Sequence, residues 1–153
     1  MTKAATEIRF YHLERSNVEQ VLPGLIVKAL ENGHRILIKT TDEKEAQRLN
    51  EHLWTYDPNS FIPHGLKKDG HADKQPVLLT TEDKNLNGAD VLILTQGAQS
   101  DQHADFKLCC EMLDGRDEEA VNAARERWKK YKAEGFTITY WQQGAKGWEK
   151  KSG

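Results

Sequence analysis

The sequence has little cysteine and no long apolar run. Its two cysteines, Cys109 and Cys110, are adjacent within an apolar stretch, a spacing that suits neither an ordinary disulfide nor a metal pair. No apolar run approaches the roughly 20 residues that a membrane-spanning helix needs, and no apolar signal core precedes the first expected strand. We therefore expect reduced, structural cysteines, no membrane contact and a cytoplasmic location.

An excess of charge of one sign is also missing. The chain has 22 Lys and Arg residues against 24 Asp and Glu residues, a formal net charge of -2. Such a surface does not attract phosphates strongly by its average field, so any basic binding site must be local. The 153 residues contain only 4 Pro, and their composition is that of an ordinary globular domain with its own core.

The motifs of common catalytic and cofactor-binding sites are absent. We find no Gly-rich phosphate fingerprint of the Rossmann or P-loop kind and no Ser in a nucleophile elbow. The histidines show no metal-ligand spacing; they are His12, His34, His52, His64, His71 and His103. We expect no intrinsic catalytic activity, no metal and no cofactor, although α/β sheets often place active sites at the ends of their strands.

Apolar periodicity predicts strands that alternate with helices. Short apolar runs predict six strands, at residues 8–13, 35–39, 76–80, 91–95, 106–113 and 136–141. Helical spacing with capping signals predicts three helices, over residues 16–33, 40–54 and 117–134. Short connections between them indicate one three-layer α/β domain over residues 1–143, with a central, largely parallel (mixed) sheet flanked by helices.

Two local features qualify this outline. Pro23 and Gly24 fall inside the first predicted helix and should bend it or loosen one turn. The Gly- and Lys-containing residues 144–153 are expected to form a flexible C-terminal tail.

The helix predicted over residues 117–134 has two distinct faces. Small and aromatic residues on one face should pack on the sheet; these are Ala120, Ala124 and Tyr131. The other face carries one large aromatic residue among cations: Val121, Arg125, Trp128, Lys129 and Lys132. A solvated face explains the cations alone, but an exposed indole forgoes roughly 1.5–3 kcal/mol of burial. Trp128 should therefore pack on the tail or line a pocket suited to an acidic peptide that ends in an aromatic residue and a free carboxylate.

Several segments resemble the DNA polymerase III chi subunit family. The stretch from Ala124 to Phe136 (ARERWKKYKAEGF) resembles the family's C-terminal helix motif. The other matching segments are Phe10–Leu13, Asp42–Ala46 leading to Leu53–Trp54, Ser60–His64, and Val91–Leu94. They occur in the family's order over nearly the whole chain. The resemblance implies a Rossmann-like topology without a nucleotide site.

The same resemblance implies a function. It indicates a non-catalytic accessory subunit of the clamp-loader complex of DNA polymerase III holoenzyme, which binds the acidic, Pro-Phe-ending C-terminal tail of single-stranded DNA-binding protein. By motif, Arg125 would meet the terminal carboxylate or nearby acids, and Trp128 and Val121 would contact the Phe ring. Lys129 and Lys132 would attract the acidic residues, and contact with DNA would be indirect. Trp128 stands where the family commonly has Tyr, another aromatic wall.

A second surface of the family binds the psi subunit. The matching residues here are Trp54, Phe61, Ile62, Pro63 and His64. A structural role is the alternative, with Trp54 in the core and Phe61 and Pro63 fixing the loop. Because a psi subunit is not evident in every lineage that carries chi, this surface could serve another partner or none.

Direct binding of single-stranded nucleic acid is the competing function. The cations between Arg125 and Lys132, with Trp128 and Tyr131, could neutralise phosphates and stack bases. The patch is small, however, and the negative net charge is accompanied by no second basic strip. We therefore rank this function below the adaptor role.

Overall fold

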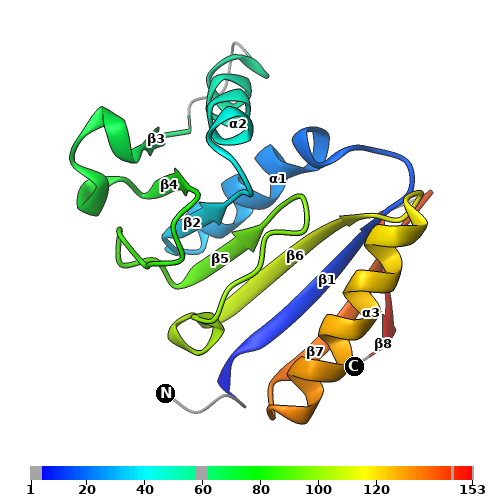
Figure 1. Cartoon of the computed structure of the whole chain (residues 1–153). Coiled ribbons are helices and arrows are strands. Elements are labelled where there is room, and N and C mark those ends of the chain that lie inside the picture. The colour runs from blue at the N-terminus through cyan, green and yellow to red at the C-terminus, as the bar shows by residue number, and fades with distance from the viewer. Residues whose placement is uncertain (1–4, 58–61, 146, 153) are drawn as a thin grey trace.

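The computed structural model describes residues 5–57, 62–145 and 147–152 (Figure 1). They form an 8-stranded sheet in the order β3-β4-β2-β5-β6-β1-β7-β8. The strands are β1 (Glu7–Leu13), β2 (Ile36–Lys39), β3 (Gly65–Leu66), β4 (Val77–Thr80), β5 (Val91–Leu94), β6 (Leu108–Asp114), β7 (Thr137–Gly144) and β8 (Gly147–Ser152). The α-helices are α1 (Val18–Glu31), α2 (Glu43–Thr55) and α3 (Glu118–Ala133), and short 3-10 helices span Lys67–Asp69, Ala72–Lys74 and His103–Asp105.

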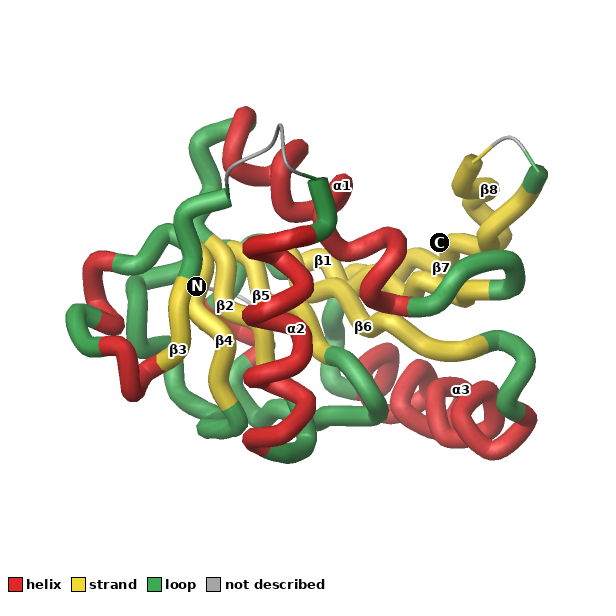
Figure 2. The backbone as a smooth tube through the Cα atoms, turned by 90° about the horizontal axis from the view of Figure 1, so that it is seen from above, coloured by secondary structure: helices red, strands yellow, loops and turns green. Residues whose placement is uncertain are grey.

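The helices make the fold three-layered, as predicted. Figure 2 shows α1 and α3 on opposite sides of the sheet. Buried residues of α1 and α2 share one apolar cluster with the sheet, and buried residues of α3 belong to the other. All strand pairs are parallel except β7 with β8, which confirms the largely parallel, mixed sheet.

Side-chain alternation along β1 connects the two apolar clusters. Ile8 and Phe10 point toward α3, whereas Tyr11 and Leu13 point toward α1 and α2. All four are buried. Because β1 lies between β6 and β7, it has no free edge and contributes to the core on both faces.

The C-terminal segment differs from the sequence prediction. We expected residues 144–153 to form a tail outside a domain ending at residue 143, but Gly147–Ser152 forms β8, antiparallel to β7. The positive φ of 120° at Gly147 helps the chain reverse. Trp148 then packs edge-on against Tyr11, with ring centroids 4.9 Å apart. One apolar side chain and the unpaired edge of β7 thus hold a segment whose Gly and Lys content is typical of a tail.

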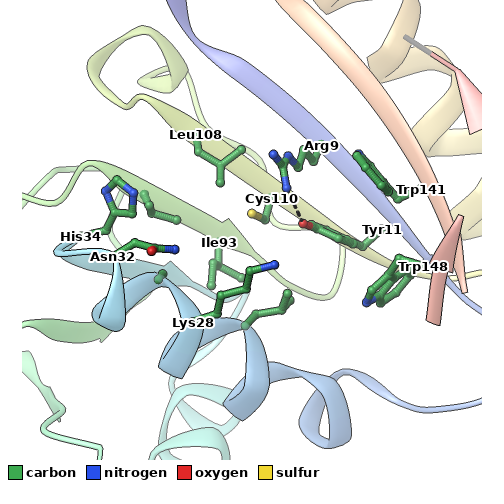
Figure 3. Close-up of a pocket in the computed structure, with 13 residues that line it drawn as sticks. Arg9, Tyr11, Lys28, Asn32, His34, Ile93, Leu108, Cys110, Trp141 and Trp148 are labelled. Atoms are coloured by element: carbon green, nitrogen blue, oxygen red, sulfur yellow. Dashed lines mark hydrogen bonds between the residues drawn. The ribbon is translucent and has the colours of Figure 1, made fainter. Parts of the chain in front are cut away.

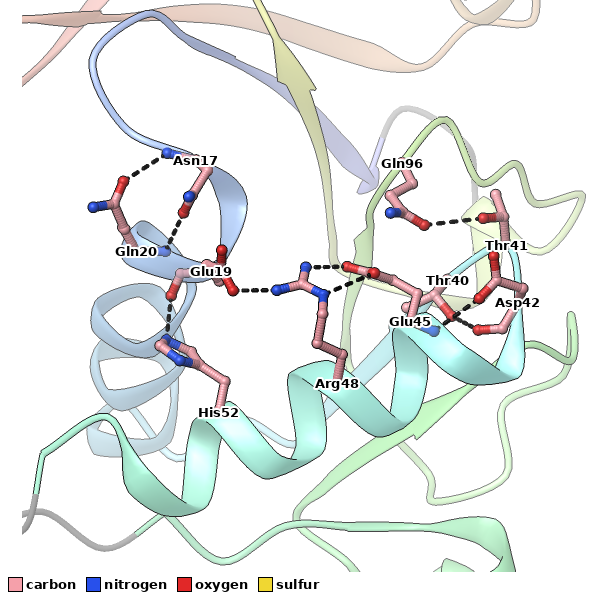
Figure 4. A network of polar contacts seen from close by, with 10 residues as sticks. All are labelled: Asn17, Glu19, Gln20, Thr40, Thr41, Asp42, Glu45, Arg48, His52 and Gln96. Carbon is pink, nitrogen blue, oxygen red and sulfur yellow. Dashed lines mark hydrogen bonds and ion pairs between the residues drawn. The ribbon is translucent and has the colours of Figure 1, made fainter.

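Pro23 lies inside α1, and the helix nevertheless continues from Val18 to Glu31. Proline has no N–H, so the Glu19 carbonyl four residues earlier loses its usual helical donor. The Nε2 atom of His52, on α2, lies 2.7 Å from that carbonyl oxygen and donates to it (Figure 4). Arg48 of α2 also bridges the carboxylates of Glu19 and Glu45. The helix therefore does not break at Pro23, because a neighbouring helix supplies the missing donor.

We predict that His52 and Pro23 are energetically coupled. His52→Ala should lower the free energy of unfolding by about 1–3 kcal/mol, because it leaves the Glu19 carbonyl without a donor. In a Pro23→Ala background the new backbone N–H of residue 23 can donate to that carbonyl. His52→Ala should then lower the free energy of unfolding clearly less than it does in the wild type. Urea unfolding of the two single variants and the double variant measures the coupling, with Glu51→Ala on the exposed side of α2 as the control. An equal effect of His52→Ala in both backgrounds would contradict this account.

Candidate functional site

Helix α3 rests on the sheet through the face that its sequence predicts. Ala124 and Tyr131 are buried, and Ala120 is half-buried. Phe10 of β1 lies beneath the helix, with its ring centroid 5.8 Å from that of Trp128 and 6.1 Å from that of Tyr131. This contact leaves the opposite side of α3 facing solvent.

A buried ion pair fixes the rotation of α3. The Nε atom of Arg127 donates to the Glu111 carboxylate of β6 over 2.6 Å, and Glu111 is only 2% exposed. Burial and this carboxylate together raise the pKa of the Tyr131 hydroxyl above its usual value. Sequence reasoning missed the pair, although a single glutamate inside the apolar run from Cys109 to Leu113 was a signal for it.

A groove of about 1000 Å³ runs between α3 and the strands β1, β7 and β8. Its aromatic side consists of Trp128 and Tyr140, whose rings lie 6.0 Å apart in an edge-to-face arrangement. The residues that line it are His12, Asn122, Arg125, Glu126, Trp128, Lys129, Tyr140, Gln142 and Lys151.

Three of the five residues predicted on the outer face of α3 meet in this groove: Arg125, Trp128 and Lys129. Arg125 and Lys129 are exposed, while Trp128 is half-buried against the core and also lines the groove. Val121 and Lys132 do not line it. Val121 packs partly against the core beneath the helix, and Lys132 is exposed outside the groove.

The other side of the groove comes from strands and was not predicted. His12 of β1 and Tyr140 of β7 point toward α3, and the His12 Nδ1 atom lies 2.5 Å from the Tyr140 hydroxyl. Gln142 follows Tyr140 on the same face, and Lys151 reaches the groove from β8. Period-2 alternation along residues 138–142 could have placed Tyr140 and Gln142 on one face. Lys151 could not be placed without knowing that β8 exists.

The groove concentrates positive charge that is only weakly engaged within the protein. Lys129 lies 3.5 Å from Glu126 and Lys151 lies 3.0 Å from Glu149, both as exposed pairs. Such pairs contribute about 0–1 kcal/mol, so an acidic ligand can replace them. Arg125 provides a third cation, and its charge acts on Tyr140. Burial raises the pKa of the Tyr140 hydroxyl, and the positive charge of Arg125 offsets part of that rise.

The residues matched to a psi-binding surface fall into two groups. Trp54 is 47% exposed, and its ring lies 4.1 Å from that of His64. Ile62 and His64 are buried, and both ring nitrogens of His64 lie within hydrogen-bond distance of backbone carbonyls, those of Ile62 and Asn50. Pro63 is exposed, and Phe61 lies outside the described residues. Ile62 and His64 therefore support the loop, while Trp54 and Pro63 face solvent.

The carboxyl ends of the strands, where Rossmann-like folds usually bind nucleotides, are acidic here. A depression of about 620 Å³ at this end is lined by three carboxylates, Asp114, Asp117 and Glu119, and by one cation, Arg127, which pairs with Glu111. Asp117 caps the first turn of α3 by accepting from the backbone N–H groups of Glu119 and Ala120. These carboxylates repel phosphate from the helix N-terminus that would otherwise attract it.

The described residues carry neither a helix long and apolar enough to cross a membrane nor a group of three or more His, Cys, Asp and Glu side chains able to hold a metal ion. Cys109 and Cys110 are buried and not joined in a disulfide, as expected. Burial raises the pKa of both thiols, that of Cys110 to about 12.

These features define a Rossmann-like α/β protein with a cationic, aromatic groove beside its last helix. The fold resembles the C-terminal domain of the DEAD-box protein Dbp5, with a TM-score of 0.60 and 13% identity over 90% of this chain and 91% of that one. A family model for the DNA polymerase III chi subunit, HolC, matches residues 5–139, and the chain belongs to this family.

Individual relatives agree with the family match. The chain is 32% identical to DNA polymerase III subunit chi of Escherichia coli K12 over 124 residues, 80% of this chain and 84% of that protein. It is 28% identical to the Haemophilus influenzae protein of the same name, over 88% of this chain and 96% of that one. A probable chi subunit of Rickettsia prowazekii is 36% identical over 92 residues, which are 60% of this chain and 56% of that protein.

We predict that Arg125→Ala raises the pKa of the Tyr140 hydroxyl further. Removing a nearby positive charge disfavours the phenolate, so the titration should move to higher pH. An ultraviolet titration of the tyrosines, taken as the difference between each protein and its Tyr140→Phe counterpart, measures this shift. Lys130→Ala, on the same helix but outside the groove, should leave the titration unchanged. A Tyr140 titration that is the same with and without Arg125 would refute the proximity of the two side chains.

Proposed function

We propose that this chain is a non-catalytic accessory subunit that holds the acidic C-terminal tail of single-stranded DNA-binding protein in the groove beside α3. Through this contact it links coated DNA to the clamp-loader complex of DNA polymerase III. The observation that carries the proposal is the convergence of Arg125, Trp128 and Lys129 with Tyr140 and Lys151 in one groove.

The chemistry of the groove matches a tail that is acidic and ends in Phe. Trp128 and Tyr140 offer ring faces and edges to a Phe side chain, whose burial contributes roughly 1.5–3 kcal/mol. Arg125 can bind a carboxylate with two hydrogen bonds, and Lys129 and Lys151 stand where preceding acidic residues can reach them. Two or three charged hydrogen bonds contribute about 1.5–3 kcal/mol each.

Ordering the tail offsets part of this gain. The balance corresponds to micromolar affinity, about 8 kcal/mol. Because much of the attraction comes from exposed charges, salt should weaken the binding.

The carboxylates in and beside the groove disfavour direct binding of single-stranded DNA. Glu126 lies in the groove and Glu149 neighbours Lys151, so a continuous phosphate backbone would pass carboxylates as well as cations. A short peptide end needs only one cationic cluster and one aromatic surface. This difference favours the tail over DNA as the ligand.

We predict that neighbouring lysines on α3 differ sharply in their effect on tail binding. Lys129→Ala and Arg125→Ala should each weaken a peptide copying the acidic, Pro-Phe-ending tail by about tenfold or more, because each removes a charged hydrogen bond. Lys130→Ala makes the same change in net charge one position along the helix but faces away from the groove, so its affinity should stay near wild type. Isothermal titration calorimetry at low and at moderate salt measures all four proteins.

Two further titrations complete this test. A peptide without the final Phe should bind far more weakly, and a bare oligonucleotide should not bind tightly. Equal losses in Lys129→Ala and Lys130→Ala would mean that general charge, and not the groove, attracts the peptide. Tight, salt-dependent binding of the oligonucleotide would favour the nucleic-acid function instead.

For the second surface, we propose that Trp54 and Pro63 contact the psi subunit. Trp54 combines high exposure with ring packing on His64, an arrangement that presents an apolar surface on a rigid base. Trp54→Ala should abolish copurification with a coexpressed psi subunit and leave the unfolding midpoint within a few degrees of wild type. Undiminished copurification would refute this assignment.

A further inference from the structure

A second pocket, of about 380 Å³, lies on the face of the sheet opposite the groove (Figure 3). Its floor is apolar and comes from the central strands, with Ile93, Leu108 and Cys110 among its residues. The side chains of Lys28 and Asn32 project into it from the end of α1. The volume falls within the range of about 300–1000 Å³ that is usual for small-molecule sites.

Three aromatic rings form the wall opposite α1. Tyr11 is the most buried of the three, and Trp148 packs edge-on against it. Trp141 lies on β7, next to β1. The guanidinium carbon of Arg9 lies over its ring, 5.4 Å from the ring centroid. Trp141 and Trp148 follow residue 139, where the family match ends. The aromatic wall is thus built largely by the part of this chain outside that match.

The charges around the pocket nearly cancel, with one exception. Arg9 forms hydrogen bonds of 2.7 and 3.3 Å to the Glu7 carboxylate, and His34 lies 2.5 Å from the Asp90 carboxylate. Burial alone would raise the pKa of the Glu7 carboxyl, but hydrogen bonds from Arg9 and Thr139 hold it below its usual value. Lys28, which is exposed to solvent, forms no ion pair with a carboxylate of the described residues, and its side chain points toward the pocket (Figure 3).

We propose that this pocket binds a small planar aromatic molecule with a single anionic group. The ring lies against Tyr11 and Trp148 over the apolar floor, and the anion accepts from the Lys28 ammonium and the Asn32 amide. A neutral ring gains no charged hydrogen bond from Lys28 and should therefore bind more weakly than an anionic one. A polyanion such as a nucleoside triphosphate carries more charge than the Lys28 ammonium can offset, since the lining residues Arg9 and His34 are already paired with Glu7 and Asp90. One unpaired cation and three rings therefore select a monoanionic aromatic compound.

The experiment uses 8-anilinonaphthalene-1-sulfonate as the probe and N-phenyl-1-naphthylamine, which has the same rings without the sulfonate, as its neutral counterpart. The wild-type chain should bind one sulfonate probe, detected by energy transfer from tryptophan. Lys28→Met, which keeps the apolar stem, should weaken the sulfonate about tenfold or more and leave the neutral probe unchanged. Trp148→Ala should weaken both probes. Lys44→Met, on the exposed surface of α2, is the matched control and should change neither.

The outcomes separate this pocket from the groove beside α3. Arg125→Ala should leave the sulfonate probe bound as in wild type, and Lys28→Met should leave binding of the acidic tail peptide unchanged. Circular dichroism of each variant shows that the fold is retained. Equal affinity of the sulfonate for wild type and Lys28→Met, or for wild type and Trp148→Ala, would overturn the proposal. Binding of several equivalent probe molecules per chain, with an affinity that neither Lys28→Met nor Trp148→Ala changes, would also overturn the proposal.

Discussion

The buried ion pair between Arg127 and Glu111 is the interaction on which the groove beside α3 depends. It joins the middle of α3 to a central strand, at a site where the carboxylate is 2% exposed. Leaving one member of such a pair alone costs about 3–5 kcal/mol, so the pair strongly disfavours other rotations of the helix. With Arg127 turned inward, Trp128 packs on Phe10, and Arg125 and Lys129 face outward beside it. The same rotation determines which cations reach the groove and which do not.

Because side chains alternate along a strand, the strands β1, β7 and β8 each contribute residues both to the groove beside α3 and to the pocket on the opposite face of the sheet. On β1 and β7, His12 and Tyr140 face the groove, while Tyr11 and Trp141 face the pocket. β8 continues this division, because Lys151 reaches the groove and Trp148 reaches the pocket. A single antiparallel strand added to the edge of the sheet therefore contributes to both sites. Changes in β8 that shift its register would affect both sites, because a one-residue slip exchanges the two faces.

Local sequence signals were sufficient for most of the architecture. Capping residues and apolar periodicity predicted the three helices, and apolar runs predicted six of the strands. The inner face of α3, with Ala124 and Tyr131, was also predicted correctly. These features depend on spacing within one segment, which a sequence displays directly.

The features that sequence reasoning missed all depend on contacts between distant segments. The strand β8 forms because β7 has an open edge and Tyr11 receives Trp148, and neither is visible in the composition of residues 144–153. The helix through Pro23 was predicted, but not that His52 of another helix donates to the Glu19 carbonyl that Pro23 leaves without its helical donor. Val121 and Lys132 belong to the predicted stripe but miss the groove, since its far wall is formed by strands that the helical wheel does not include.

The most direct test of tail binding beside α3 uses the four tryptophans of the chain as reporters in one NMR titration. Trp128 lines the groove, Trp141 and Trp148 line the second pocket, and Trp54 lies on the exposed side of α2. On addition of the acidic, Phe-ending tail peptide, the indole N–H signal of Trp128 should shift strongly while those of Trp54, Trp141 and Trp148 stay in place. A shift centred on Trp54 or on the Trp141 and Trp148 pair, with Trp128 unchanged, would contradict the assignment of the tail to this groove.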